Sequence, residues 1–202
     1  MTVHMPTEAE NVANVMATVA GRHFGGLAAI EHLVRESGGA SRQTWSFDAV
    51  VNGKRHGLIL RRDPPTLSPS ASSPDAASPH GERSTSLDRA TEFRVLHAAF
   101  RAGVRAPEVL FELAPADGLG EAYVMRRIGG TAIARKLLRD APYAAARGRI
   151  AGQLGEILAR IHATDLATLP PLAHREAIDH IAGLRHPLGS VAHAVLPRTM
   201  PA

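Results

Sequence analysis

Arginine dominates the residues of this sequence that could bind a charged ligand. Of the 23 basic residues only Lys54 and Lys136 are lysines. A guanidinium can hold phosphate oxygens through two parallel hydrogen bonds, so arginines or backbone amides would make any phosphate contact. The 202 residues include no cysteine, which excludes a thiolate nucleophile and a cysteine-bound metal. A nucleophilic site around His162 and Asp165 lacks the strand–turn–helix that exposes a catalytic serine.

Glycines and alternating side chains predict three antiparallel strands. A short apolar strand leads into a glycine-bearing turn at residues 37–41. Over residues 44–49 apolar and polar side chains alternate, as in a half-buried strand, with Asp48 on the polar side. Asn52 and Gly53 are typical of a tight hairpin, because both central positions need positive φ. The returning strand is expected over residues 57–62.

Two more strands and several helices are predicted from the rest of the chain. A helix beginning at Thr7 carries one apolar face and is expected to end near Gly21. Residues 63–86 are rich in Pro, Ser and Ala without an apolar period, which is typical of a flexible insertion. The other expected elements are a helix over 87–102, strands over 107–113 and 121–125, helices over 133–139 and 142–162, and a weaker helix over 175–184.

The order of these elements is similar to that of the aminoglycoside phosphotransferase family. It resembles most the branch that includes the kinase-like domain fused to some acyl-CoA dehydrogenases. No single motif is specific, but their order and spacing are. The matching segments are Ser37 to Ser46, Leu58 to Pro64, Glu92 to Leu96, Gly103 to Glu108, Tyr123 to Gly130 and Leu154 to His162.

This resemblance implies an α+β fold: a protein-kinase-like small lobe, made of a five-stranded antiparallel sheet plus a helix, followed by an incomplete helical lobe. Residues 1–128 would form the small lobe, including the N-terminal helix and the 63–86 insertion. Residues 129–185 would begin the helical lobe. Residues 186–202 do not resemble the family and are expected to form an irregular tail.

The resemblance also implies ATP or GTP, with Mg²⁺, as cofactors. The family holds the α- and β-phosphates with a basic residue on the third strand, usually lysine, which a helix glutamate orients. These positions fall on Arg61 and Glu92. Met125 would be the gatekeeper beside adenine, and the backbones of Arg126 and Ile128 its hydrogen-bond partners. The phosphates would also meet the backbone of the glycine turn, which consists of Ser37, Gly38, Gly39, Ala40 and Ser41.

The residues that would carry out phosphoryl transfer are missing from this sequence. The family needs a catalytic-loop Asp that receives the substrate proton, an Asn that holds Mg²⁺ and a second metal-binding Asp. The last asparagine is Asn52, and after Ile150 the only aspartates are Asp165 and Asp179, neither of them in a His-x-Asp setting. We therefore expect no catalytic residue and no Mg²⁺ ligand here, in a chain truncated before the catalytic loop and inactive alone.

Two hypotheses of function stay open. The chain is either a piece of a kinase that phosphorylates a small hydroxyl compound, or a catalytically dead nucleotide-binding or regulatory module that acts through a partner. A nucleic-acid partner is disfavoured, because the net charge of +4 is spread along the chain and mixed with acids. No signal peptide and no apolar run of about 20 residues is visible, so we expect no membrane partner and a cytoplasmic location.

Overall fold

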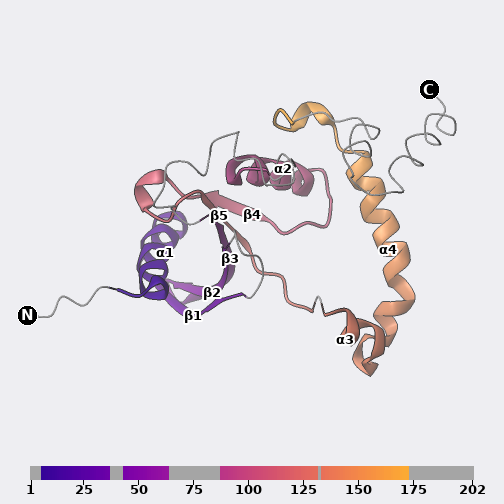
Figure 1. The fold of residues 1–202 in the computed structure, drawn as a ribbon, viewed down its shortest axis with the longest axis horizontal. Coiled ribbons are helices and arrows are strands. Elements are labelled where there is room, and N and C mark those ends of the chain that lie inside the picture. The colour runs from indigo at the N-terminus through magenta and orange to yellow at the C-terminus, as the bar shows by residue number, and fades with distance from the viewer. Residues whose placement is uncertain (1–5, 37–42, 64–86, 132, 173–202) are drawn as a thin grey trace, which may run out of the picture. The chain divides into compact units, whose positions relative to one another are not determined.

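A computed structural model describes residues 6–36, 43–63, 87–131 and 133–172. Its main feature is a five-stranded sheet with helices (Figure 1). The elements are α1 Glu8–Phe24, β1 Ala28–Arg35, β2 Gln43–Val51, β3 Lys54–Arg62, α2 Arg89–Arg101, β4 Val109–Glu112, β5 Ala122–Arg126, α3 Ala134–Arg139 and α4 Ala144–His162, with short 3-10 helices at Pro115–Asp117, Ala141–Tyr143 and Leu166–Thr168.

The sheet is antiparallel throughout, with the strand order β1-β2-β3-β5-β4. Asn52 and Gly53 join β2 to β3 with φ values of 49° and 75°. Positive φ at both residues matches the right-handed twist of the strands that they connect. The predicted hairpin and the predicted five-stranded antiparallel sheet are therefore confirmed. Together with the helices they form an α+β fold consistent with a kinase-like small lobe and a helical part.

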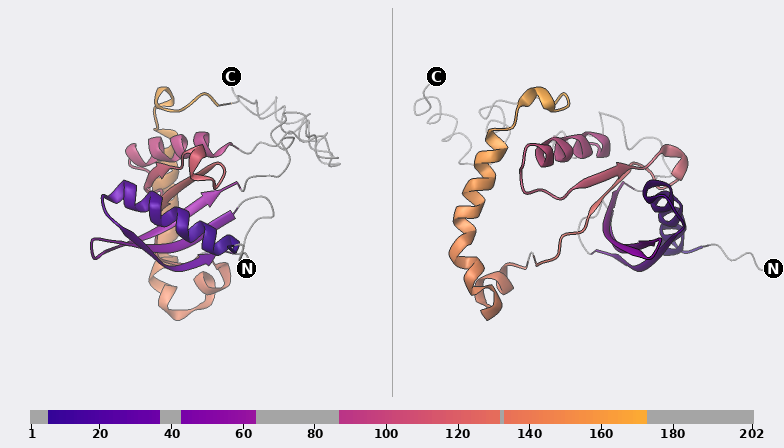
Figure 2. Two further views of the ribbon diagram at one scale, coloured as in Figure 1. Left: turned by 90° about the vertical axis from the view of Figure 1, so that its left-hand side faces the viewer. Right: turned by 180° about the vertical axis from the view of Figure 1, so that it is seen from behind.

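Helix α1 provides the apolar core on one face of the sheet. It begins with a capping box, in which the Thr7 side chain accepts from the Glu10 backbone and Glu10 reaches back to the Thr7 backbone. Its buried residues Val12, Met16 and Val19 belong to one core cluster with sheet residues such as Phe47. Figure 2 shows α1 lying along the sheet from two further sides.

The end of α1 differs from the sequence prediction. We expected the helix to end near Gly21, but it continues to Phe24, and Gly25 adopts the left-handed conformation at its C-cap with φ 77°. The Gly25 amide donates to the Gly21 carbonyl at 2.9 Å. Glycine is the usual residue at this position because it has no Cβ. The other helices and strands lie within a few residues of their predicted bounds.

Helix α2 lies on the opposite face from α1, against β4 and β5. Asp88 caps its first turn by accepting from the Thr91 amide at 2.6 Å. The Phe93 ring packs edge-on against Tyr123 of β5, with a centroid distance of 6.0 Å. Arg89 is the only residue of α2 that is fully buried. Polar contacts therefore contribute more to the position of α2 on the sheet than to that of α1.

Helices α3 and α4 are joined to each other by a guanidinium. The Arg147 Nη1 donates to the carbonyls of Leu137 and Asp140, at 3.0 Å in both cases. This arginine satisfies carbonyls at the end of α3 that have no partner within that helix. The predicted start of the long helix at Pro142 is replaced by the 3-10 turn Ala141–Tyr143, after which α4 runs from Ala144 to His162.

Several sequence predictions concern residues outside the described ones. These are the glycine turn at 37–41, the 63–86 insertion after Asp63, the helix over 175–184 and the tail from 186 onward. All the described helices and strands belong to one unit, Met1–Leu67 with Leu87–Pro170. Among the described residues no helix has the length and apolar character needed to cross a bilayer.

We predict that Phe47→Ala lowers the free energy of unfolding by about 3–5 kcal/mol, because Phe47 is fully buried beneath α1. Urea unfolding followed by circular dichroism measures the loss. Leu27→Ala is the control, since Leu27 is 95% exposed and its removal opens no cavity. Equal losses in the two variants would contradict this placement of the core.

Candidate functional site

The two arginines that end β3 point to opposite faces of the sheet. Arg62 is buried and pairs with Glu8 at the start of α1, with Nη2 to Oε1 at 2.6 Å. Arg61 faces α2 and pairs with Glu92, with Nη1 to Oε1 at 3.0 Å. Successive side chains of a strand alternate between faces, so the register of β3 decides which arginine meets α2. The ion pair that the family order predicts for Arg61 and Glu92 is present.

A second arginine extends this ion pair toward the start of α2. Arg89 contacts the other carboxylate oxygen of Glu92, and its Nη2 donates to the Leu87 carbonyl at 2.9 Å. Its Nε lies 3.2 Å from Asp63 Oδ2, just beyond the end of β3. Glu92 therefore lies between two guanidiniums, one from β3 and one from its own helix. This arrangement fixes the carboxylate that orients Arg61.

Part of Arg61 has no partner among the described residues. Its side chain is 30% exposed, and its Nε is buried without a hydrogen bond. A buried donor without a partner costs free energy unless water or a ligand satisfies it. Arg61 thus combines a guanidinium held by Glu92 with unused donor capacity on the same face of the sheet, as an anion site requires.

Tyr123 lies on the same face and borders this ion pair. Its side chain is fully buried, and its hydroxyl makes no hydrogen bond of acceptable geometry with the described residues. Burial is the main cause that raises the pKa of Tyr123 to about 12; the charge of Glu92 adds to the rise and that of Arg61 opposes it. The phenol therefore stays neutral at ordinary pH.

The segment after β5 carries the predicted hinge residues. Met125 is half-buried and pairs in register with Ile59 of β3. The Arg126 amide donates to the Glu108 carbonyl at 2.8 Å, and its Nε to the Glu108 carboxylate, also at 2.8 Å. Ile128 is exposed, and its amide makes no backbone hydrogen bond within the described part of the chain. Met125 is the register partner of Ile59, and Ile59 is two positions before Arg61 in β3. Side chains two positions apart in a strand share a face, so Met125 and Arg61 lie on the same face.

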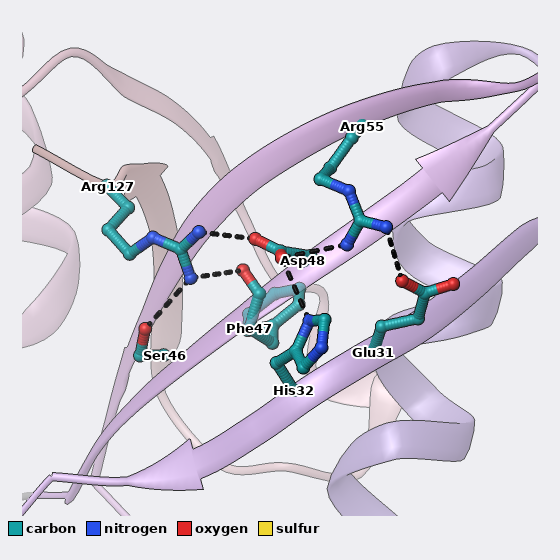
Figure 3. Close-up of polar contacts among 7 residues, drawn as sticks. All are labelled: Glu31, His32, Ser46, Phe47, Asp48, Arg55 and Arg127. Carbon is teal, nitrogen blue, oxygen red and sulfur yellow. Dashed lines mark hydrogen bonds and ion pairs between the residues drawn. The ribbon is translucent and has the colours of Figure 1, made fainter. Parts of the chain in front are cut away.

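Sequence reasoning missed a polar cluster on this face, centred on Asp48 of β2. His32, Arg55 and Arg127 all contact its carboxylate (Figure 3). Burial raises the pKa of Asp48, but the hydrogen bonds from the two guanidiniums and the imidazole outweigh it and leave the pKa below its usual value. The sequence placed Asp48 on the polar side of its strand but gave no signal that Arg127 lies over it.

Two other features bear on ligand binding. Among the described residues no group of three His, Asp or Glu side chains is arranged to hold a metal ion. A cavity of about 510 Å³ lies between the start of α2 and the β4–β5 connection, and Asp88, Arg89, Glu112 and Glu121 contribute to its lining. Arg61 and the hinge do not line it. The cavity therefore adjoins the candidate site at Arg89, which also contacts Glu92, but it does not include the proposed phosphate contact at Arg61.

We predict that the Tyr123 phenol resists ionisation in the folded chain. The sequence has two tyrosines, so Tyr143→Phe leaves Tyr123 as the only one. At about pH 10.5 its near-ultraviolet absorbance should be that of a neutral phenol when folded and of a phenolate in urea, where the pKa is about 10. Because the folded pKa is raised, the stabilisation is fully present below the unfolded pKa and is lost as the pH rises through about 12.

The effect of Glu92 tests the cause of this shift. Glu92→Gln in the same Tyr143→Phe background removes a negative charge that raises the pKa, so ionisation should begin at lower pH. Identical titrations in the folded and the urea-unfolded chain would contradict the burial of Tyr123.

Comparison with known proteins assigns the family. A search of curated proteins found no match to the chain. A scan against protein-family models matched residues 33–187 to the phosphotransferase enzyme family. The matched segment begins within β1 and includes Arg61, Glu92, the hinge and α4. Since it covers more than half of the 202 residues, the chain belongs to the phosphotransferase enzyme family, whose fold is kinase-like.

Proposed function

We propose that the sheet face carrying Arg61 and Glu92 binds a nucleoside triphosphate, ATP or GTP. The observation that carries the proposal is the 3.0 Å ion pair between these two side chains. An arginine held by a carboxylate presents its remaining N–H groups in a fixed direction, which lowers the entropy lost when phosphate binds. The α- and β-phosphates would lie against Arg61, the residue that stands in place of the family's lysine.

Arginine is a reasonable substitute for lysine at this position. Lysine offers a compact charge, whereas a guanidinium offers five donors in a planar fork. Glu92 takes one of these donors, and the Arg61 Nε has no partner among the described residues. A phosphate oxygen in this position would therefore satisfy a buried donor as well as add a charge-assisted hydrogen bond.

The nucleobase is proposed to lie at the hinge, beside Met125. The Arg126 amide already donates to Glu108, so only its carbonyl is left to accept from an adenine amino group. The Ile128 amide is free of backbone partners within the described residues and could donate to a ring nitrogen. The backbone amides of residues 37–41, which lie outside the described residues, are also proposed to contact the phosphates. In this division residues 1–128 form the nucleotide-binding lobe, and residues 129–185 begin the helical lobe.

The reaction that we propose for the family branch is phosphorylation of a small hydroxyl compound, with Mg²⁺ bound to the nucleotide. The branch is the one that resembles the kinase-like domain of acyl-CoA dehydrogenase fusion proteins. Phosphoryl transfer needs a side chain that accepts the proton of the substrate hydroxyl, and side chains that bind the metal ion. These 202 residues have no asparagine after Asn52. Asp165 is occupied as a cap, accepting from the Ala167 amide at 2.9 Å. We therefore propose that this chain does not turn over alone.

No aspartate of these 202 residues stands in the setting of the family's catalytic loop, and this favours a second candidate, a nucleotide-binding or regulatory module that acts through a partner. The two candidates share the nucleotide site and differ in what completes it. An extended chain that gains phosphotransferase activity would support the enzyme. Nucleotide-dependent binding of a partner without phosphoryl transfer would support the module.

We predict that Arg61→Met weakens ATP binding by roughly 10- to 100-fold, the usual range for hydrogen bonds to charged groups. Glu92→Gln should weaken binding less, because the guanidinium remains but loses the carboxylate that orients it. Calorimetric titration with ATP measures both. Arg22→Met is the matched control, since Arg22 pairs with Asp117 at 3.0 Å and is 58% exposed. An equal loss in the control would contradict the assignment.

We also predict that the 202-residue chain releases no ADP or GDP in an acceptor-dependent manner, because positioning and charge neutralisation at the transferred phosphate are missing. The assay follows ATP and GTP turnover with Mg²⁺ over a panel of small hydroxyl compounds. Acceptor-dependent turnover by this chain itself would overturn the proposed inactivity and leave the nucleotide site in place.

A further inference from the structure

Asp48 joins three strands and the hinge through a single carboxylate. Its side chain is 8% exposed and lies at the centre of the contacts drawn in Figure 3. The Arg55 Nη1 of β3 lies 2.9 Å from Oδ2, and the His32 Nδ1 of β1 lies 3.1 Å from the same oxygen. The guanidinium of Arg127, just after β5, contacts Oδ1. Asp48 of β2 therefore connects β1, β3 and the segment after β5 on this face.

Both the backbone and the side chain of Arg127 are hydrogen-bonded to the sheet. Its amide donates to the Gly57 carbonyl at 2.9 Å. Its Nη1 donates to the Ser46 hydroxyl at 3.2 Å and to the Phe47 carbonyl at 3.4 Å, as Figure 3 shows. These contacts lie on the same face as Arg61, because Ser46 pairs in register with Ile59. The guanidinium therefore crosses from the hinge to β2.

Gly57 leaves the space for this guanidinium. A Cβ at this residue would lie 3.0 Å from the Arg127 Nη2 and 3.3 Å from its Cζ. These distances are shorter than van der Waals contact, so a Cβ at this position would require the guanidinium to shift by a few tenths of an ångström. Gly57 and Asp48 are register partners in the β2–β3 pair, and Arg127, 79 positions after Asp48, packs against both.

Arg127 is flanked by the two residues proposed to contact the base. Fixing its backbone amide on Gly57 and its guanidinium on Asp48 restrains the peptide groups of Arg126 and Ile128 on either side. A hydrogen bond to a base depends on the direction of the carbonyl and the amide, and restraint of these groups before binding reduces the entropy cost. The Asp48 contact is thus in a position to control base recognition without touching the ligand.

We propose that Asp48, acting through Arg127, is a positioning residue for recognition of the nucleobase. The inference rests on the proposed nucleotide site and adds to it a determinant of how strongly the base, as distinct from the phosphates, contributes to binding. A purely structural ion cluster would change stability and weaken all ligands alike. A positioning residue changes the affinity for a complete nucleotide relative to a ligand that has phosphates but no base.

The test compares ATP with inorganic tripolyphosphate, a probe without a base, in calorimetric titrations of the full chain. Asp48→Asn and Arg127→Gln should each weaken ATP by about tenfold and tripolyphosphate by less than about twofold, as expected for loss of one or two neutral hydrogen bonds at the hinge. Arg127→Lys keeps a charge for Asp48 but loses the fork that reaches Ser46 and Phe47. Its loss of ATP affinity should be intermediate.

Asp117→Asn is the matched control. Asp117 also accepts two hydrogen bonds from an arginine, Arg22, at 3.0 and 3.2 Å, and its side chain is 10% exposed. It joins α1 to the β4–β5 connection and has no contact with the hinge. This variant should lose stability without changing the ratio of the two affinities. If Asp48→Asn fails to fold, Arg127→Gln carries the test, because the Arg127 side chain is 36% exposed and Asp48 keeps Arg55 and His32 as partners.

The outcomes separate this inference from the proposed function. Equal weakening of ATP and tripolyphosphate by the Asp48 and Arg127 variants overturns the inference and leaves the nucleotide site standing. An unsubstituted chain that binds both probes equally well also overturns it, because the base then contributes nothing. An unsubstituted chain that binds neither probe contradicts the nucleotide site itself, and the inference falls with it. A selective loss of ATP in both variants, absent in Asp117→Asn, supports it.

Discussion

The ion pair between Arg61 and Glu92 is the interaction on which the candidate site depends. Arg89 is the only fully buried residue of α2, so apolar burial contributes less to the position of this helix than to that of α1. Glu92 contacts a guanidinium from β3 and one from its own helix. Both side chains are partly exposed, and Glu92 keeps a guanidinium partner in Arg89 if Arg61 is lost. The charges that would hold phosphate thus also hold the helix that orients them.

The two faces of the sheet have different roles: the face toward α1 forms the apolar core, and the opposite face carries the candidate site. The face toward α1 is apolar and closed, and its one buried arginine, Arg62, is neutralised by Glu8. The opposite face carries Arg61, Tyr123 and the Asp48 cluster, and the Asp48 carboxylate is buried and paired with two guanidiniums and an imidazole. Buried polar groups are retained only where they are satisfied or serve a ligand. Three buried polar atoms that have no hydrogen bond with the described residues, the Arg61 Nε, the Arg89 Nε and the Tyr123 hydroxyl, gather around the ion pair of Arg61 and Glu92.

Most of the fold could be predicted from local signals, whereas half of the candidate site could not. Asn52 and Gly53 set the hairpin, and alternation along residues 44–49 assigned the faces of β2. The choice of Arg61 as the arginine that meets α2 came from the family resemblance, and the register of β3 places its side chain on that face. The contact between Asp48 and Arg127 spans 79 positions and depends on the pairing of β3 with β5 and on the missing side chain of Gly57. A single sequence gives no signal for such a contact.

Amide hydrogen exchange with and without ATP and Mg²⁺ tests the central claim most directly, because it locates the ligand without relying on turnover. The account predicts slower exchange in β3 around Arg61 and in the hinge at residues 126–128, with no change in α1. Unchanged exchange at these positions would contradict it. Protection confined to the cavity lined by Asp88 and Glu121 would place the ligand elsewhere in the lobe and contradict it as well.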